Sequence, residues 1–371
     1  MGMELVLCGE FSLGKCGELW YDYFGGTTMK KTMWFLDAAA GTKPLYKAET
    51  YRTETNWLNP NAGYSVREKK MISECEQVIK KAIGGEKGHV YFGGVASQLM
   101  ENFFNWLYIE YPNFNVLTNI TDHDSLYRFG VTRGFYTLKT IRTVTPVNNI
   151  TGLIHGTQMA KFRKENGDYI FCDATAMAGH VKIENADELY DAVVVSGHKF
   201  NAPKAGFLWV SDELYREANM YDFKIHGTPD QFEIKALTDA FVWANTLKIK
   251  QNENTWKELE HYLCDKLKES NVKFSCIANT PIKTPAITAI TLDEINADSL
   301  QQFAASRNVF IGVGHSACDA ESDYRVLVKG FGLTEKQARE TVRISFDWNT
   351  DAEDIDKFVE CVVDYKKRFN V

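Results

Sequence analysis

A lysine directly follows a strongly apolar segment near the middle of the chain. Residues 193–199 (VVVSGHK) have the pattern of a buried strand that ends abruptly in polar residues. In open α/β folds, ligands bind just beyond the carboxyl ends of the strands. A lysine held there is partly desolvated, which favours the neutral amine that can form a Schiff base. Lys199 is therefore a candidate nucleophile, with an ordinary surface lysine as the alternative.

Three other strand-like segments also end in polar side chains. Asp173 lies near the end of the segment 169–175, where a carboxylate can pair with a protonated pyridine nitrogen and deepen an electron sink. Asn149 follows the segment 138–144, and its amide can donate to a phenolate oxygen. His123 follows the segment 114–119, and its imidazole can stack on an aromatic ring or move protons. Together these residues are typical of a site for an aromatic cofactor.

A cysteine near the C-terminal end of the chain has surroundings unlike those of a core thiol. Cys318 lies in the Gly-rich, polar stretch 312–320, which has no apolar periodicity to bury it. An accessible thiol near His315 can reach the thiolate form, which is the nucleophile. The alternative is an incidental surface cysteine.

The elements that must position these residues alternate between strands and helices. Strand-like apolar segments occur at 33–37, 89–92, 114–119, 138–144, 169–175, 192–197 and 206–210. Amphipathic helices are expected between them, for example over 66–83, where Val66, Met71, Val78 and Ile79 suggest an apolar face. This alternation predicts a mainly parallel sheet covered by helices on both faces. A long helical stretch is expected from about 232 to 269, then a smaller α/β unit that ends in a helix over 352–369.

Composition excludes several classes of protein. The chain has 371 residues, a formal net charge of −7 and 25% charged residues. No apolar run reaches the roughly 18 residues of a membrane span, and the acidic balance argues against nucleic acid as the main partner. Eight scattered cysteines without a CxxC pair favour a reducing, cytoplasmic compartment. No metal site is expected, because His89, His155 and His261 have no partner at metal-ligand spacing.

The first 31 residues look separate from the rest. They are Gly-rich and end in Gly25, Gly26, Thr27 and Thr28, just before Met29. Either Met29 is the natural start or the segment is a short ordered extension, and the sequence leaves both interpretations open.

Several motifs together resemble the cysteine desulfurases, enzymes of the aminotransferase class V type that depend on pyridoxal 5'-phosphate (PLP). The similarity is closest to the group that includes the housekeeping iron–sulfur cluster enzymes, and it runs from about residue 33 to the end. The motifs stand in the family's order: Phe-Leu-Asp-Ala-Ala-Ala at 35–40, Asn-Pro-Asn-Ala at 59–62, His-x-Ser at 123–125, Asn-Asn-x-x-Gly at 148–152, Asp-Ala-Thr at 173–175, Ser-Gly-His-Lys at 196–199, His-Ser-Ala-Cys at 315–318 and Arg-Ile-Ser at 343–345.

The resemblance implies a role for each matched residue. Lys199 would hold PLP as a Schiff base and move the substrate α-proton, while His123 would stack on the ring and exchange protons. Cys318 would take the sulfur of L-cysteine as a persulfide and leave L-alanine, and Arg343 would clamp the substrate carboxylate, helped by Asn149. The remaining cofactor contacts would come from Asp173 at the pyridinium nitrogen, Asn149 at the ring oxygen, and the phosphate-binding or nearby residues Ser196, Gly197, His198, Gly94, Val95, Ala96, Ala176 and Thr228.

The resemblance also implies the architecture. It is PLP-dependent transferase fold type I, with a large, mainly parallel seven-stranded sheet domain and a smaller α/β C-terminal domain. We expect an extension over 1–31, a large PLP-binding domain over 45–245, and a small domain built from 32–44 and 246–371 that carries Cys318. A homodimer is implied, as is a sulfur-acceptor protein or thiol for iron–sulfur or other sulfur chemistry.

The chain departs from the family pattern around the phosphate and the ring oxygen. Ala96 stands where a threonine is usual, and Ala176 where a glutamine is usual. The segment from Lys199 to Thr228 is also short and lacks the usual Gly-rich run. Loss of one neutral hydrogen bond costs roughly 0.5–1.5 kcal/mol, enough to weaken retention of PLP without abolishing it. Two other hypotheses therefore stay open: a different class V enzyme, such as a selenocysteine lyase or an aminotransferase, and a catalytically silent partner subunit.

Overall fold

The computed structural model describes residues 31–52, 58–111, 113–131, 139–315 and 324–370. Contacts divide the chain into Met1–Met33 and Trp34–Val371, and all the described helices and strands belong to the second unit. The expected extension over 1–31 lies almost wholly outside the described residues. The expected boundaries at 45 and 245 within the second unit stay a prediction.

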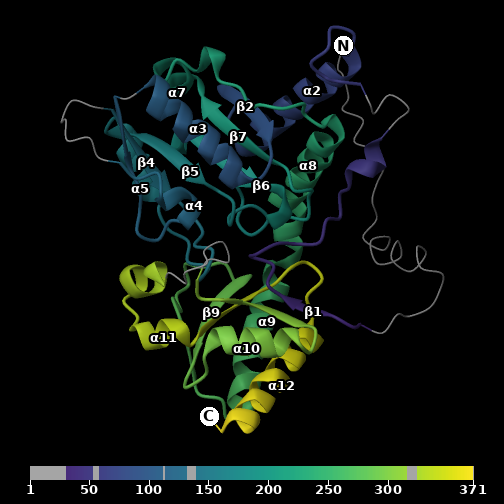
Figure 1. Ribbon diagram of the computed structural model, residues 1–371, viewed down its shortest axis with the longest axis vertical. Helices are drawn as coiled ribbons and strands as arrows, with labels where there is room; N and C mark the ends of the chain where they lie inside the picture. The colour runs from purple at the N-terminus through teal and green to yellow at the C-terminus, as the bar shows by residue number, and fades with distance from the viewer. Residues whose placement is uncertain (1–30, 53–57, 112, 132–138, 316–323, 371) are drawn as a thin grey trace. The chain divides into compact units, whose positions relative to one another are not determined.

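The larger sheet has six strands among the described residues (Figure 1). Four adjacent strands are parallel, and β7 alone runs in the opposite direction. The expectation of a mainly parallel sheet is confirmed, but the described strands number six where seven were expected. In spatial order they are β2 (Gly88–Gly93), β7 (Gly206–Ser211), β6 (Ala192–Ser196), β5 (Tyr169–Asp173), β4 (Lys139–Val144) and β3 (Phe114–Leu117).

The smaller sheet joins the two ends of the described chain. Its first strand, β1, pairs in parallel with β10, although about 270 residues separate the two strands. The other pairings are antiparallel. In spatial order the strands are β1 (Trp34–Leu36), β10 (Val309–Val313), β11 (Thr341–Ser345), β9 (Ile287–Leu292) and β8 (Phe274–Cys276).

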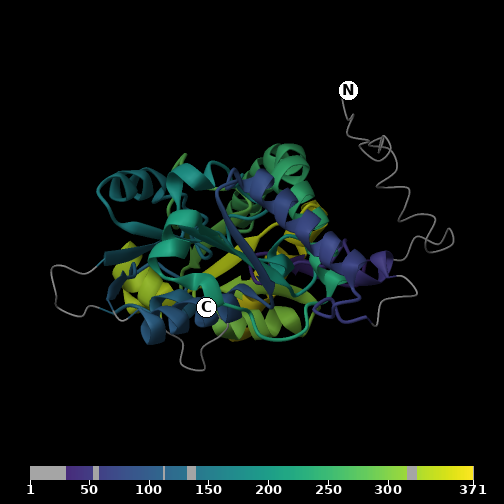
Figure 2. The same ribbon diagram turned by 90° about the horizontal axis from the view of Figure 1, so that it is seen from above.

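Helices cover both faces of the larger sheet, because successive side chains of its central strands point in opposite directions. In β6, Val193 and Val195 pack in the same apolar cluster as Ile79 of α2 (Val66–Ile83), whereas Val194 packs with Phe103 of α3 (Ala96–Glu110). Figure 2 shows the same elements from above. The bounds of α2 agree with the sequence, but Val66 and Val78 are exposed, and its buried face is formed by Glu68, Cys75, Ile79 and Ile83.

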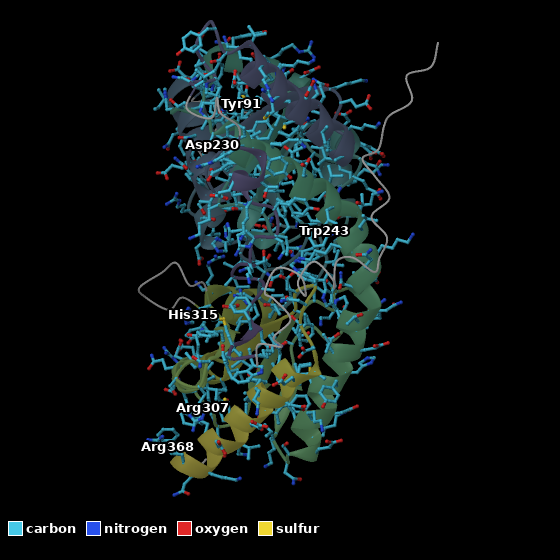
Figure 3. All side chains as sticks on the ribbon, turned by 90° about the vertical axis from the view of Figure 1, so that its right-hand side faces the viewer. Tyr91, Asp230, Trp243, Arg307, His315 and Arg368 are labelled. Atoms are coloured by element: carbon cyan, nitrogen blue, oxygen red, sulfur yellow. The ribbon has the colours of Figure 1, made fainter. Side chains whose placement is uncertain are left out.

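The expected long helical stretch is confirmed, with a local irregularity. Helix α8 (Gln231–Trp243) continues through one π-helical turn, Ala244–Lys248, into α9 (Ile249–Glu269). Trp243 is labelled at this junction in Figure 3. A π turn inserts one extra residue per turn and often marks a functional position. Here it brings Lys248 into the protein interior.

The remaining helices are short, apart from the last. The C-terminal helix α12 (Ala352–Phe369) has the predicted bounds, begins with a capping box between Asp351 and Asp354, and packs against β1 and β10. No helix among the described residues is both long and apolar enough to cross a bilayer. The others are α4 (Asp124–Tyr127), α5 (Thr157–Glu165), α6 (Ala186–Leu189), α7 (Asp212–Glu217), α10 (Ala297–Ala305) and α11 (Glu335–Arg339), with single turns at Ala48–Tyr51, Gly197–Lys199, Met220–Asp222 and Val326–Gly330.

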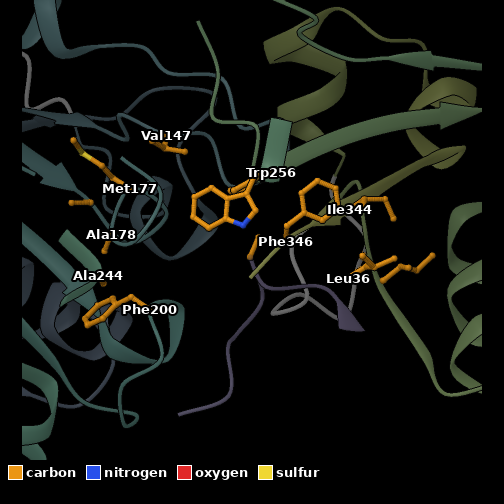
Figure 4. Close-up of a cluster of buried hydrophobic side chains, with 14 of the residues drawn as sticks. Leu36, Val147, Met177, Ala178, Phe200, Ala244, Trp256, Ile344 and Phe346 are labelled. Atoms are coloured by element: carbon orange, nitrogen blue, oxygen red, sulfur yellow. The ribbon is translucent and has the colours of Figure 1, made fainter. Parts of the chain in front are cut away.

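One apolar cluster connects the two sheets. Trp256 of α9 is fully buried, and its indole N–H donates to the backbone carbonyl of Asp347 at 3.1 Å. Figure 4 labels Trp256 in this cluster together with Phe200, which follows β6, and Phe346, which follows β11. The segments after these two strands are therefore held together by apolar packing.

Candidate active site

A cavity of about 210 Å³ lies beyond the carboxyl ends of β4, β5 and β6. This is the edge at which an open α/β sheet binds ligands. The residues that the sequence predicts for the site and that line this cavity are Lys199, Asp173, His123, Asn149, Ser196, His198, Val95, Ala96 and Ala176.

Lys199 ends the single turn that follows β6. Its Nζ donates hydrogen bonds to the carbonyl oxygens of Ala39 at 2.6 Å and Ala40 at 2.9 Å. The turn requires glycine at Gly197, because a Cβ there would lie 2.5 Å from the Pro203 carbonyl oxygen. The amine is therefore held at the cavity by backbone from the segment after β1.

Asp173 is the last residue of β5 and is only 4% exposed. Its Oδ1 accepts a hydrogen bond from the backbone N–H of Thr175 at 3.0 Å. The Thr175 hydroxyl also lines the cavity, and within the described residues it is buried without a hydrogen-bond partner. A buried hydroxyl without a partner costs free energy, so this wall of the cavity suits a polar ligand.

His123 caps the short helix α4. Its Nδ1 accepts the backbone N–H of Ser125 at 3.2 Å and lies 2.8 Å from the Ser125 hydroxyl. Burial lowers the pKa of His123, although the nearby carboxylates of Asp173 and Asp124 oppose the shift. The ring is therefore neutral near pH 7, with the proton on Nε2. A neutral imidazole can both stack and exchange a proton.

Another group of lining residues is suited to an anion. Helix α3 begins at Ala96, and no side chain caps its first turn, so its N–H groups can bind a phosphate. The Ser196 hydroxyl lies 2.9 Å from Nδ1 of His198. Burial, with Lys199 and Lys204 nearby, lowers the pKa of His198 to about 4. His198 is therefore a neutral hydrogen-bonding residue of this group.

Arg343 of β11 reaches from the smaller sheet to the loop that carries Asn149. Its NH1 donates to the backbone carbonyl of Asn149 at 3.1 Å, and its NH2 pairs with Asp37 Oδ1 at 2.7 Å. Its Nε is buried without a hydrogen-bond partner within the described part of the chain. Gly312 makes room for this pair, because a Cβ there would lie 2.7 Å from both Arg343 Nε and Asp37 Oδ1.

Some predicted residues lie elsewhere. Thr228 lines a separate cleft of about 660 Å³ that Phe223 and His226 also line. Gly94 and Gly197 adjoin lining residues along the chain. Cys318 lies outside the described residues. His315, three residues before it, places Nε2 2.9 Å from Asp298 Oδ1.

Several polar residues at or near the cavity were given no role of their own in the sequence analysis. Thr175 and Ser125 line the cavity and stand two residues after Asp173 and His123, a spacing that could have identified both. Asp122 was also missed. It is fully buried, and its carboxylate accepts hydrogen bonds from the hydroxyls of Thr143 and Thr145, which fixes the loop before His123.

His180 makes the stability of the protein dependent on pH. Burial, with Lys248 nearby, lowers its pKa to about 4 from the ordinary 6.5, so between these values the unfolded chain binds a proton that the folded chain does not. The free energy of unfolding should therefore fall as the pH drops through this range, by about 3 kcal/mol for this residue. In chemical denaturation at the two ends of the range, His180→Gln should lose less stability than the wild type. Equal losses would contradict the expectation.

The fold and the site define the class of protein. The sequence model of the family "Aminotransferase class-V" matches residues 139–358, so the chain belongs to the aminotransferase class V family. Members of this class generally use PLP. Its expected architecture, fold type I, is confirmed by solved structures. A "NifS-like protein" has a TM-score of 0.76 and 14% identity, and the match covers 91% of this chain and 100% of that one. A "NifS-like protein from Rickettsia africae ESF-5" has a TM-score of 0.74 and 18% identity, with coverage of 91% of this chain and 100% of that one.

Proteins of similar sequence point to one group within this family. A "Probable cysteine desulfurase" of Borreliella burgdorferi is 22% identical over 393 residues, covering 89% of this chain and 90% of the relative. A "Cysteine desulfurase IscS" of Methanosarcina thermophila is 23% identical over 362 residues, covering 84% and 85%. The predicted resemblance to the cysteine desulfurases is thus confirmed.

Proposed function

We propose that this protein is a PLP-dependent cysteine desulfurase, which converts L-cysteine to L-alanine and leaves the sulfur as a persulfide on Cys318. The observation that carries the proposal is the grouping of Lys199, Asp173 and His123 around one cavity, from three separate segments of the chain. The names of the relatives in Borreliella and Methanosarcina support the same activity.

The residues around the cavity fit PLP. Its phosphate would bind at the uncapped start of α3 with Ser196 and His198, where neutral and backbone donors face an anion. Asp173 would pair with the pyridinium nitrogen, and the unpaired hydroxyl of Thr175 would gain a hydrogen-bond partner. Ala176 supplies no hydrogen bond to the ring oxygen, so Asn149 would have to supply it alone.

The chain's own groups divide the remaining tasks. When bound, PLP supplies an electron sink for negative charge on the substrate α-carbon. Lys199 would carry the proton to and from that carbon, because its side chain ends in a basic amine and lines the same cavity as Asp173. Arg343 would hold the substrate carboxylate with its guanidinium, which contacts the backbone of the cavity residue Asn149. The ion pair with Asp37 helps to orient that guanidinium.

The sulfur step is assigned to Cys318 from the sequence. The thiolate would attack the substrate sulfur, forming an S–S bond as the Cβ–S bond breaks. The reaction L-cysteine plus Cys318 thiol gives L-alanine plus Cys318 persulfide, so atoms and electrons balance without an added oxidant. The persulfide would pass to an acceptor protein or thiol in the cytoplasm, for iron–sulfur cluster assembly or other sulfur transfer. In a homodimer, Thr228 would reach the phosphate of the other subunit.

Replacement of the proposed persulfide cysteine tests the function. Cys318→Ser should still bind PLP and change its absorbance when L-cysteine is added, because the cofactor contacts are untouched. Alanine formation should fall by at least about 100-fold, since a hydroxyl does not replace the thiolate nucleophile. The matched control is Cys276→Ser, a half-buried cysteine of β8, which should keep wild-type turnover. Wild-type rates from Cys318→Ser would overturn the persulfide step.

A further inference from the structure

Arg325 connects the C-terminal part of the chain to the loop that carries His123. The side chain is buried, at 5% exposure. Its NH2 donates to the carbonyl oxygen of Asp122 at 2.8 Å and to Asp124 Oδ1 at 2.6 Å, and its NH1 donates to the carbonyl oxygen of Ile120. One guanidinium thus binds residues on both sides of His123.

Two further contacts bring the same segments close together. The Arg325 guanidinium carbon lies 3.8 Å from the centre of the ring of Tyr127, which is the last residue of α4. Gly330, at the end of the turn that begins beside Arg325, faces Thr121 so closely that a Cβ would lie 2.8 Å from its Cγ2. The loop 120–124 is therefore packed against this turn as well as hydrogen-bonded to Arg325.

The opposite side of the loop is attached to the larger sheet. The buried Asp122 carboxylate accepts hydrogen bonds from Thr143 and Thr145 near the end of β4. The loop is therefore attached on two sides. Asp122, and the Thr121 carbonyl that accepts from the Asn148 amide at 3.3 Å, attach it to β4 and the segment after β4, and Arg325 attaches it to the C-terminal part of the chain. Only the second depends on residues far away in the sequence.

We propose that Arg325 is a positioning residue for the reaction: by binding Ile120, Asp122 and Asp124 together it fixes the His123 ring against the cavity. The inference rests on the proposed role of His123 in the desulfurase reaction. Arginine is suited to this task because its planar fork supplies several donors in fixed directions, whereas lysine supplies a point charge. Lysine at this position would keep the charge and lose the geometry.

The test compares Arg325→Met and Arg325→Lys with the wild type by two readouts. In the PLP-free protein, ¹⁵N NMR of His123 reports whether Nδ1 still accepts the Ser125 amide and at which pH the ring titrates. The charged groups that face the ring are Asp173, Asp124, Lys199 and Arg343. In the PLP-loaded protein, alanine formation gives kcat and KM separately.

Loss of the guanidinium should free the loop. We expect Arg325→Met to lose the Nδ1 hydrogen-bond signature, to titrate closer to an ordinary histidine, and to lower kcat by about 10- to 100-fold with KM nearly unchanged. Arg325→Lys should resemble Arg325→Met. Added guanidinium should partly restore kcat of the methionine variant. Asp124→Ala removes one Arg325 contact and keeps the buried arginine, and it should show a smaller loss of the Nδ1 hydrogen-bond signature and of kcat.

The control is Arg128→Met. Arg128 is exposed, follows the last residue of α4 and pairs with Glu101, so its replacement should leave both readouts unchanged. Wild-type His123 signals in Arg325→Met would overturn the proposal, and so would full recovery in Arg325→Lys, because charge alone would then account for the effect. If the wild type forms no alanine, the proposed function fails, while the NMR comparison still decides whether Arg325 positions His123.

Discussion

Lys199→Ala is expected to abolish alanine formation, with a loss in kcat/KM of at least about 10⁴-fold. Two functions of one side chain disappear together, the covalent attachment of PLP and the movement of the α-proton. The variant should also leave two backbone acceptors, the carbonyls of Ala39 and Ala40, without their Nζ donor. That loss should lower the free energy of unfolding by about 1–3 kcal/mol.

Activity, reduction trapping and denaturation check this expectation separately. Borohydride reduction should attach PLP to the wild-type protein and not to Lys199→Ala. The matched control is Lys204→Ala, an exposed lysine on the segment that follows β6, which should keep both activity and trapping. If Lys204→Ala prevented trapping and Lys199→Ala did not, the assignment of the cofactor lysine would be wrong.

Lys248→Met is expected to destabilise the protein strongly. Lys248 has no exposed surface, and its Nζ forms an ion pair with Asp347 Oδ1 at 2.7 Å and donates a hydrogen bond to Asn201 Oδ1 at 2.8 Å. The Asn201 amide in turn donates to the other Asp347 oxygen at 2.7 Å. Removing one partner of a buried pair leaves an uncompensated charge, at a cost of about 3–5 kcal/mol.

The same change should also loosen the cofactor lysine. Asn201 stands two residues after Lys199 and has the left-handed backbone, with φ of 68°, so its side-chain contacts help to fix that turn. Urea unfolding should show a lower midpoint with an unchanged slope, and the protein should retain PLP less well. Lys250→Met, two residues further on and exposed, is the control. Equal stability of the two variants would contradict a role for the buried pair.

Local periodicity predicted many of the elements. The helix over 352–369 and the long stretch from 232 to 269 are as expected, because sequence-local apolar spacing determines both. The solvent exposure of Val66 and Val78 could not be predicted. Apolar residues occur on more than one side of this helix, and the sequence does not show which side the sheet covers. Strand direction was also hidden, and β7 turned out antiparallel to its neighbours.

Much of the cavity lining could be predicted from the polar residues that follow apolar segments, because such residues meet at one edge of a parallel sheet. Lys199, Asp173, His123 and Asn149 line it together. Contacts between distant segments were not predictable. Arg343 pairs with Asp37 across 306 residues and Arg325 with Asp124 across 201, and single-sequence periodicity carries no signal for such pairs.

The most direct test of the account is the yield of products from L-cysteine. The protein would be loaded with PLP and incubated with L-cysteine and a reducing thiol, and alanine and sulfide would be measured together. We expect equal amounts of both, since each turnover moves one sulfur atom through Cys318 to the thiol. A PLP spectrum that responds to amino acids without release of sulfide, or a protein that neither binds PLP nor forms alanine, would contradict the desulfurase assignment.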